Sequence, residues 1–384
     1  MNFDTLFEAN KESSLQGRYI TLDHIEPLIE RIKKQGTVSI EGYSVENRPI
    51  YVCKLGTGQT KLYMWSQMHG NEGTTTKALF DLIHLLLDQS EFSKKILNNF
   101  TFCIIPMLNP DGSALYTREN ANKVDLNRDS FSLSQPESKV LREVFESFWP
   151  DYCFNLHDQR TIFAAGDTNK PATVSFLSPS YNEARDVNEV RLKAMNIIVA
   201  MNTELQRYIP GQVGRFDDSF NINCIGDMFQ FLGVPTVLFE AGHYENDYER
   251  EITRKYIFIA LVSALSNVYE NVIVDNKMND YLNIPQNKAK FYDFIYKNVK
   301  ISYDGKQIIT NFAAQYKEVL NLGLVGFEAR IQEIGELDGY VGHFEYDAEG
   351  AEYADESKNY PEINQKADFL LGNKIKVTNG MLKF

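Results

Sequence analysis

Residues 62–76, LYMWSQMHGNEGTTT, decide how we interpret the rest of the chain. LYMWSQM is an apolar run of strand length that contains aromatic residues. Gly70 and Gly73 mark a tight loop, and apolar residues at helical spacing follow up to about residue 89. The pattern predicts a strand, a loop and a helix. It places His69 and Glu72 at the carboxyl end of the strand, where open α/β sheets bind their ligands.

Three further apolar runs of strand length end in polar side chains. Residues 100–108 lead into Asn-Pro-Asp-Gly, residues 151–158 deliver His157, and residues 234–242 deliver Glu240. Helical patterns separate these runs. Alternating strands and helices predict an α/β fold, with a mixed, mostly parallel sheet covered by helices on both faces.

After about residue 276 the helical patterns give way to strand-like runs. ISYDGKQIIT carries Asp-Gly between strand-like runs, and NKIKVTNGMLKF carries Asn-Gly in the same setting. Both patterns are typical of β-hairpins. We therefore predict a catalytic domain over residues 1–275 and a small β-rich accessory domain of unassigned role over residues 276–384.

Composition excludes several classes of partner. The formal net charge of −13 argues against nucleic acids and anionic membrane surfaces. No apolar run approaches the roughly 18 residues that a membrane span needs, and the first residues lack a signal-peptide pattern, so we expect a cytoplasmic protein. The four cysteines are far apart and form no C-x-x-C pair, which predicts buried reduced thiols.

The polar residues at the strand ends form a pattern typical of a catalytic metal site. His69 and Glu72, two residues apart in a tight loop, can both reach one Zn²⁺, and His157 supplies a third ligand. A fourth position then stays open, which is typical of catalytic zinc. Such a metal polarises a carbonyl group and lowers the pKa of water, so a general base is also needed. Glu240 is the candidate base.

Cationic and amide side chains between residues 109 and 131 suit a substrate with a carboxylate. Arg118, in LYTREN, could stabilise a developing oxyanion. Asn127 and Arg128, in VDLNRD, could hold a carboxylate, because arginine matches that group with two parallel hydrogen bonds.

These pieces occur together in a known order. RPIYVCKLG, HGNE, NPDG, TRENANKVDLNRD, NLHD and TVLFEAGH lie between about residues 40 and 265, and this part of the chain resembles the M14 family of zinc carboxypeptidases, the carboxypeptidase A-like enzymes. The resemblance implies an α/β/α fold with one zinc ion per chain. It implies these roles: zinc ligands His69, Glu72 and His157, general base Glu240, oxyanion stabiliser Arg118, and carboxylate binders Asn127 and Arg128.

One departure from the family concerns the tyrosine that caps the substrate. Family members usually place it well before the general base, where this chain reads RFDDSFNINC and has Phe220 but no tyrosine. Tyr244, in GHYEN just after Glu240, is the candidate that remains for substrate binding.

The leading hypothesis is a zinc metallocarboxypeptidase that removes a C-terminal residue from a peptide. RENANKVDLNRD also resembles the murein peptide amidases of the same family, which makes hydrolysis of γ-D-glutamyl bonds in muropeptides an alternative. HGNE and the DLNR-like run are shared with N-acyl amino acid deacylases, a second alternative. A zinc-binding pseudoenzyme is the alternative outside enzymes, and retention of a base and an arginine argues against it. The sequence leaves open the side-chain preference, the choice among these substrates and the oligomeric state.

Overall fold

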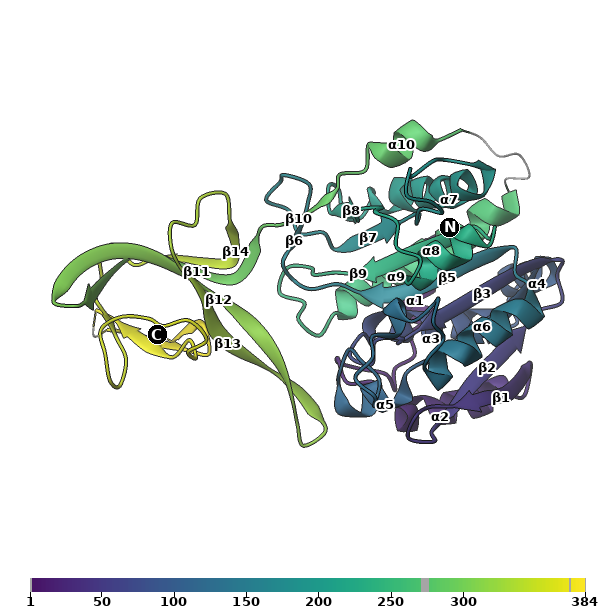
Figure 1. Cartoon of the computed structure of the whole chain (residues 1–384), viewed down its shortest axis with the longest axis horizontal. Helices are drawn as coiled ribbons and strands as arrows, with labels where there is room; N and C mark the ends of the chain where they lie inside the picture. The colour runs from purple at the N-terminus through teal and green to yellow at the C-terminus, as the bar shows by residue number, and fades with distance from the viewer. Residues whose placement is uncertain (1, 271–275, 373, 384) are drawn as a thin grey trace. The chain divides into compact units, whose positions relative to one another are not determined.

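The computed structural model of the chain describes residues 2–270, 276–372 and 374–383. It divides into two compact units, the first made of residues 1–160 and 172–287 and the second of residues 161–171 and 288–384 (Figure 1). The predicted domain boundary falls on residue 275, which lies outside the described residues. The contribution of residues 161–171 to the second unit has no counterpart in the sequence analysis.

The first unit is built on an eight-stranded sheet in the order β1-β2-β4-β3-β5-β9-β7-β8. Neighbouring strands from β4 through β3 and β5 to β9 run parallel, whereas β1, β2 and β7 introduce antiparallel pairs. The mixed, mostly parallel sheet predicted from the sequence is confirmed. Its strands are β1 (Thr37–Tyr43), β2 (Pro49–Leu55), β3 (Thr60–Ser66), β4 (Phe100–Ile105), β5 (Tyr152–Asp158), β7 (Val174–Leu177), β8 (Val213–Arg215) and β9 (Thr236–Ala241).

Helices cover both faces of this sheet (Figure 1). One hydrophobic core joins the sheet to α1, α2, α3, α7 and α9, and a second core joins the opposite face to α6 and α8. None of the described helices is long and apolar enough to cross a membrane. The helices are α1 (Phe3–Asn10), α2 (Leu22–Ile32), α3 (Thr74–Leu87), α4 (Glu91–Asn99), α5 (Pro110–Leu115), α6 (Pro136–Phe148), α7 (Glu189–Leu205), α8 (Ile225–Phe231), α9 (Glu251–Glu270), α10 (Met278–Leu282) and the 3₁₀ turn η1 (Leu126–Arg128).

Strand β5 shows how the sheet assigns side chains to its two faces. Phe154 and Leu156 belong to the first core, and Cys153 belongs to the second. Because side chains alternate along a strand, His157 lies on the face covered by α6 and α8. Strands β3, β5 and β9 are parallel neighbours, so their carboxyl ends meet at one edge. That edge carries the loop with His69, the end of β5 and the end of β9.

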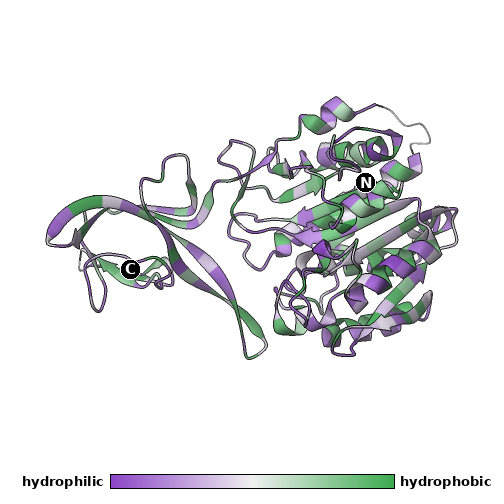
Figure 2. Cartoon of the chain, viewed as in Figure 1, coloured by the Kyte–Doolittle hydropathy of each residue, from purple (hydrophilic) through white to green (hydrophobic). Residues whose placement is uncertain are grey.

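The second unit consists of two four-stranded sheets, β13-β12-β11-β14 and β15-β16-β17-β18, and the short pair β6-β10. Both predicted hairpins are confirmed, because Tyr303 pairs with Lys306 and Thr378 pairs with Met381 across the two turns. Hydrophilic and hydrophobic residues follow one another along its long strands (Figure 2). The strands are β6 (Phe163–Ala165), β10 (Asn287–Ala289), β11 (Phe291–Tyr303), β12 (Lys306–Asn321), β13 (Leu324–Gly335), β14 (Val341–Asp347), β15 (Tyr353–Ala354), β16 (Phe369–Leu371), β17 (Ile375–Thr378) and β18 (Met381–Lys383).

Candidate metal centre

The loop between β3 and α3 carries the first two predicted ligands. The N–H of Glu72 donates to the carbonyl oxygen of His69 at 3.2 Å and closes a turn. Gly70 lets this turn lie against α5, because a Cβ at this position would come within 1.9 Å of the carbonyl carbon of Gly112. Close packing against α5 therefore explains the glycine at position 70. The turn brings the side chains of His69 and Glu72 together.

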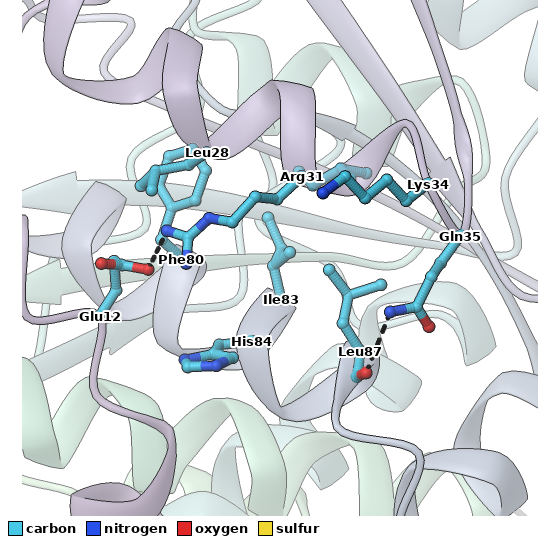
Figure 3. Close-up of a pocket in the computed structure, with 10 residues that line it drawn as sticks. Glu12, Leu28, Arg31, Lys34, Gln35, Phe80, Ile83, His84 and Leu87 are labelled. Atoms are coloured by element: carbon cyan, nitrogen blue, oxygen red, sulfur yellow. Dashed lines mark hydrogen bonds and ion pairs between the residues drawn. The ribbon is translucent and has the colours of Figure 1, made fainter.

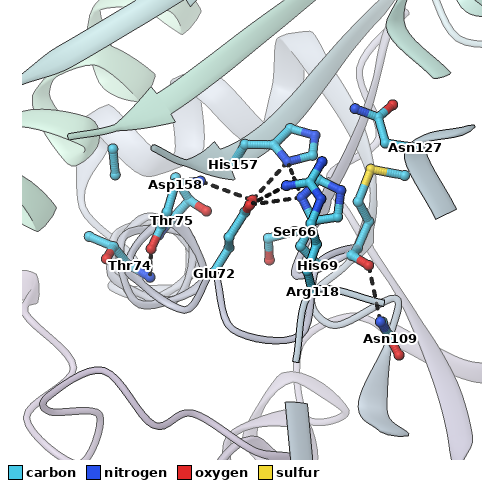
Figure 4. Close-up of polar contacts among 12 residues, drawn as sticks. Ser66, His69, Glu72, Thr74, Thr75, Asn109, Arg118, Asn127, His157 and Asp158 are labelled. Carbon is cyan, nitrogen blue, oxygen red and sulfur yellow. Dashed lines mark hydrogen bonds and ion pairs between the residues drawn. The ribbon is translucent and has the colours of Figure 1, made fainter. Parts of the chain in front are cut away.

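Donor atoms of His69, Glu72 and His157 converge at the carboxyl ends of β3 and β5 (Figure 4). His69 Nδ1 lies 2.8 Å from Glu72 Oε1, while His157 Nδ1 lies 2.8 Å from Glu72 Oε2 and 3.1 Å from His69 Nδ1. All three side chains are buried. In the part of the chain that the structure describes, no other group of histidine, cysteine or carboxylate side chains has metal-binding geometry.

The protonation pattern around His69 tests whether this set suits a metal. His69 Nε2 lies 3.0 Å from a carboxylate oxygen of Asp125, which can only accept, so Nε2 carries the proton and Nδ1 keeps its lone pair. That lone pair faces the Glu72 carboxylate and His157 Nδ1. Acceptors that face one another at this distance repel unless a positive charge, either a proton or a metal ion, lies between them. Two imidazole nitrogens and one carboxylate are a ligand set that Zn²⁺ accepts, so the residues fit that ion.

Asp125 ties the metal donors to Arg118. Its second oxygen accepts from Arg118 Nε at 3.0 Å, and Arg118 Nη1 lies 3.4 Å from Glu72 Oε1. Burial would raise the pKa of the Asp125 carboxyl, but the hydrogen bond to His69 and the charge of Arg118 hold it well below its usual range. The carboxylate therefore stays charged and orients the His69 ring, the arrangement that metal-binding histidines typically show.

Asp158 braces the same loop from the other side. Its carboxylate accepts from the backbone N–H groups of Thr74 at 2.9 Å and Thr75 at 3.1 Å, at the start of α3, and its own N–H donates to Glu72 Oε2 at 3.1 Å. Negative charge is favourable at a helix N-terminus. The buried Arg250 contributes positive charge 3.9 Å from Asp158 Oδ2. These contacts fix Glu72 relative to β5.

Glu240 lies beside His157, its register partner in β9. Among the described residues, its buried Oε2 has no hydrogen-bond partner. Burial, together with the charges of Glu72 and Asp158, raises the pKa of Glu240 well above its ordinary value. A carboxyl group with a raised pKa that is free to exchange a proton has the properties of a general acid or base.

The structure places Asn127 and Arg128 on η1, next to α8. Asn127 Oδ1 accepts from the N–H of Ile225 at 3.0 Å. The Arg128 side chain is exposed and donates to the carbonyl oxygen of Asn127 at 2.7 Å. No acidic partner for Arg128 occurs among the described residues, so its guanidinium group is available to a carboxylate.

Tyr244 is the predicted site residue that the structure does not bring to the cluster. Strand β9 ends at Ala241, and the chain then turns toward α9. The Tyr244 ring packs against Tyr256 of α9, with ring centroids 5.8 Å apart, and against the first hydrophobic core. The expected role in substrate binding therefore finds no support, because the ring faces the helix layer opposite to the one that His157 faces.

The first unit also contains a hollow of about 260 Å³ (Figure 3). None of the three metal donors lines it. It lies between α2 and α3, and the guanidinium group of Arg31 at its rim is paired with Glu12. Its floor is apolar and consists mainly of Leu28, Ile32, Phe80 and Ile83. Its titratable lining residues are Glu12, Arg31, Lys34 and His84, and the one acid among them is paired with Arg31, so we assign the hollow no chemistry.

Sequence reasoning missed the residues that orient the ligands. No pattern in the sequence connects Asp125 with His69, which lies 56 residues earlier in the chain. Asp158 directly follows the predicted ligand His157, and this position is the one indication in the sequence that it contributes to the site. Arg250 had no signal at all, since its role depends on how the chain folds back over the end of β5.

Comparisons with known proteins agree with this geometry. Residues 22–157 match the family model described as zinc carboxypeptidase, peptidase M14. Carboxypeptidase 2 of Trichophyton rubrum is 30% identical over 108 residues, which cover 28% of this chain and 19% of that protein, so the match spans a minor part of this relative. A metallo-carboxypeptidase from Burkholderia cenocepacia and carboxypeptidase A from Helicoverpa armigera share the fold, each with a TM-score of 0.50 and 18% identity. The superpositions cover 65% and 70% of this chain, and 70% and 80% of the respective structures.

Proposed function

We propose that this chain, which matches the zinc carboxypeptidase family (peptidase M14) over residues 22–157, hydrolyses the C-terminal peptide bond of peptides. The observation that carries the proposal is the cluster of His69, Glu72 and His157 donors beside Glu240. A structural metal site needs no such carboxyl group next to it, whereas a hydrolase needs a group that moves a proton.

In this proposal, His69, Glu72 and His157 hold one Zn²⁺. When bound, the ion polarises the scissile carbonyl group and lowers the pKa of the attacking water. Asp125 and Asp158 keep the ligands in place through the contacts to His69 and Glu72.

Glu240 supplies the proton transfers. Its free oxygen takes a proton from the attacking water and passes it to the amine that leaves. Arg118 stabilises the negative charge that develops on the carbonyl oxygen, because its guanidinium group lies within 3.4 Å of the cluster at Glu72 Oε1. The raised pKa of Glu240 helps the first of these transfers, since a stronger base accepts the proton of the water more readily.

Asn127 and Arg128 bind the terminal carboxylate of the substrate. The exposed guanidinium group can form two parallel hydrogen bonds to that carboxylate, which orients the peptide as well as attracts it. The second unit supplies none of these groups, and we assign it no role beyond that of an accessory domain.

The substitution Glu240→Gln tests the proposal. The variant should bind about one zinc per chain, as the parent does, and should lose nearly all hydrolysis of peptides with a free C-terminus. Mass spectrometry of mixed peptides, muropeptides and N-acyl amino acids identifies the products, with zinc content measured on the same samples. Release of single C-terminal residues by the parent supports the proposal. Cleavage confined to γ-D-glutamyl bonds or to acyl amino acids would replace it, and substantial activity in the variant would remove Glu240 as the base.

A further inference from the structure

Asn155 is a buried amide without partners, two residues before His157 in β5. Its side chain is 0% exposed, and in the described part of the chain neither Oδ1 nor Nδ2 has a hydrogen-bond partner. Leaving such groups unpaired in the interior is unfavourable, because they lose their hydrogen bonds to water without replacement. Native structures retain few of them, and each calls for an explanation such as an ordered water or a ligand.

The position of Asn155 suggests what the amide is for. Alternation along β5 places it on the same face as His157, under α8. Its register partners are Trp65 in β3 and Leu238 in β9, and the buried Nε1–H of Trp65 also lacks a partner among the described residues. Unpaired polar groups thus gather one layer below the metal donors.

Side chains next to this layer are partly exposed. Leu238 and Glu240 are partly exposed although β9 is an interior strand, whereas Val237 and Phe239 on the other face are buried. Residues 221–224, which precede α8, are also partly exposed. The partly exposed positions near Asn155 therefore lie on β9 and just before α8, the helix whose first N–H, that of Ile225, donates to Asn127.

We propose that Asn155 binds the side chain of the residue that the enzyme releases, and that it selects a neutral amide side chain. The inference rests on the proposed function. The carboxylate of that residue is bound at Asn127 and Arg128, and its scissile bond lies at the metal donors. Its side chain then enters the space between β9 and α8. No hydrogen bond of the described residues holds the Asn155 amide, so it can turn toward that side chain without breaking one.

Hydrogen-bond chemistry separates the possible side chains. An apolar side chain leaves both amide atoms of Asn155 and the Trp65 N–H unpaired. An ammonium or guanidinium group pairs with Oδ1 alone. A carboxylate accepts from Nδ2 but comes close to Glu240, whose charge opposes it. A carboxamide donates to Oδ1 and accepts from Nδ2, so of these four classes it alone satisfies both atoms of Asn155.

The test compares peptides that end in glutamine with the same peptides ending in methionine, which has nearly the same shape. The parent should favour glutamine by about tenfold or more in kcat/KM, since a site that hydrogen-bonds its substrate rejects analogues lacking that group. Asn155→Leu should abolish or invert this preference, mainly through KM. Unfolding should show that Asn155→Leu is as stable as the parent or more stable, because the amide forms no bond in the free protein.

A matched control is the buried Asn120, whose side-chain Nδ2 donates to Gln135 Oε1 at 2.9 Å and to Glu137 Oε2 at 3.0 Å. Asn120→Leu should lower the midpoint of unfolding, which shows that the stability assay detects a satisfied amide. A parent preference for methionine, lysine or glutamate, or an unchanged glutamine preference in Asn155→Leu, would overturn the inference and leave the proposed function intact.

Binding makes the test independent of turnover. Calorimetry with zinc-loaded Glu240→Gln should show tighter binding of the glutamine peptide than of the methionine peptide, and the added substitution Asn155→Leu should remove the difference. Equal binding of both peptides would overturn the inference. If the parent hydrolyses no peptide, the proposed function fails, and the calorimetric comparison still decides the role of Asn155.

Discussion

Replacement of Asp125 by alanine should weaken zinc binding without unfolding the protein. Asp125 Oδ1 accepts from His69 Nε2 at 3.0 Å, and its other oxygen accepts from Arg118 Nε at 3.0 Å. The substitution removes the acceptor that keeps the His69 proton on Nε2 and the lone pair on Nδ1. The ring is then free to turn or to adopt the other tautomer, and both changes cost metal affinity.

The structure sets the size of the effect. Loss of a carboxylate that orients a metal-binding histidine typically costs about 10–100-fold in affinity. The Asp125 side chain is 22% exposed, so water can replace part of the lost hydrogen bond to His69. We therefore expect the lower half of that range, about tenfold to thirtyfold, which corresponds to about 1.4–2 kcal/mol.

Competition with a chromophoric chelator at pH 7 measures the zinc dissociation constant directly. Asp129→Ala, four residues away, is the matched control. Asp129 is buried and accepts from the N–H groups of Ser134 and Gln135, both at 2.9 Å, but makes no contact with His69. The control should unfold at a lower temperature and keep the zinc affinity of the parent. A dissociation constant in Asp125→Ala equal to that of the parent would refute the reasoning.

Two further predictions concern the substrate carboxylate and acid stability. Arg128→Ala should reduce kcat/KM for peptides with a free C-terminus far more than for their amides; equal losses measured by mass spectrometry would contradict its carboxylate role. Glu251→Gln should lower the free energy of unfolding by a constant amount above pH 4.5. Below pH 4.5 the difference between variant and parent should shrink as the pH falls. Burial would raise the pKa of Glu251, but Lys77, at 2.6 Å, and Arg254 lower it from 4.5 to about 2. The unfolded chain thus takes up a proton first, and stability is lost between these values. Urea unfolding across this pH range measures the difference, and a difference independent of pH would contradict the pairing.

The fold was predictable where a short stretch of sequence contains the whole pattern that defines a strand, a helix or a turn. The apolar run of residues 62–68 forms β3, shifted to Thr60–Ser66, and the loop and helix follow as expected. Asp-Gly and Asn-Gly fixed the two hairpins because those dipeptides suit the turn geometry. Strands β7 and β8 are short, four and three residues, and β7 pairs with β9 while β8 pairs with β7. Local patterns cannot show such pairs.

The metal donors were predictable because each one follows a recognisable strand. Their supporting residues were not. Arg250 reaches the end of β5 from beyond β9, and its contacts with the carbonyl oxygens of Gln159 and Ala241 exist only after the chain has folded back. Asn155 lies inside a strand that reads as apolar, and its lack of partners is a property of three neighbouring strands. The place of Tyr244 could not be predicted for a similar reason, since its position after Glu240 says nothing about the direction in which the chain turns.

The two glutamates of the site show how neighbours assign different roles to one residue type. Burial raises the pKa of both carboxyl groups. At Glu72, the imidazoles of His69 and His157 outweigh burial and hold its pKa far below the ordinary range. At Glu240, the carboxylates of Glu72 and Asp158 reinforce burial and outweigh the opposing charges of Arg118 and Arg250, so the pKa rises. Environments that push the pKa values of two acids apart separate a group that stays charged from one that exchanges a proton. This difference supports Glu72 as a metal ligand and Glu240 as the base, an assignment that does not depend on the order of the motifs in the chain.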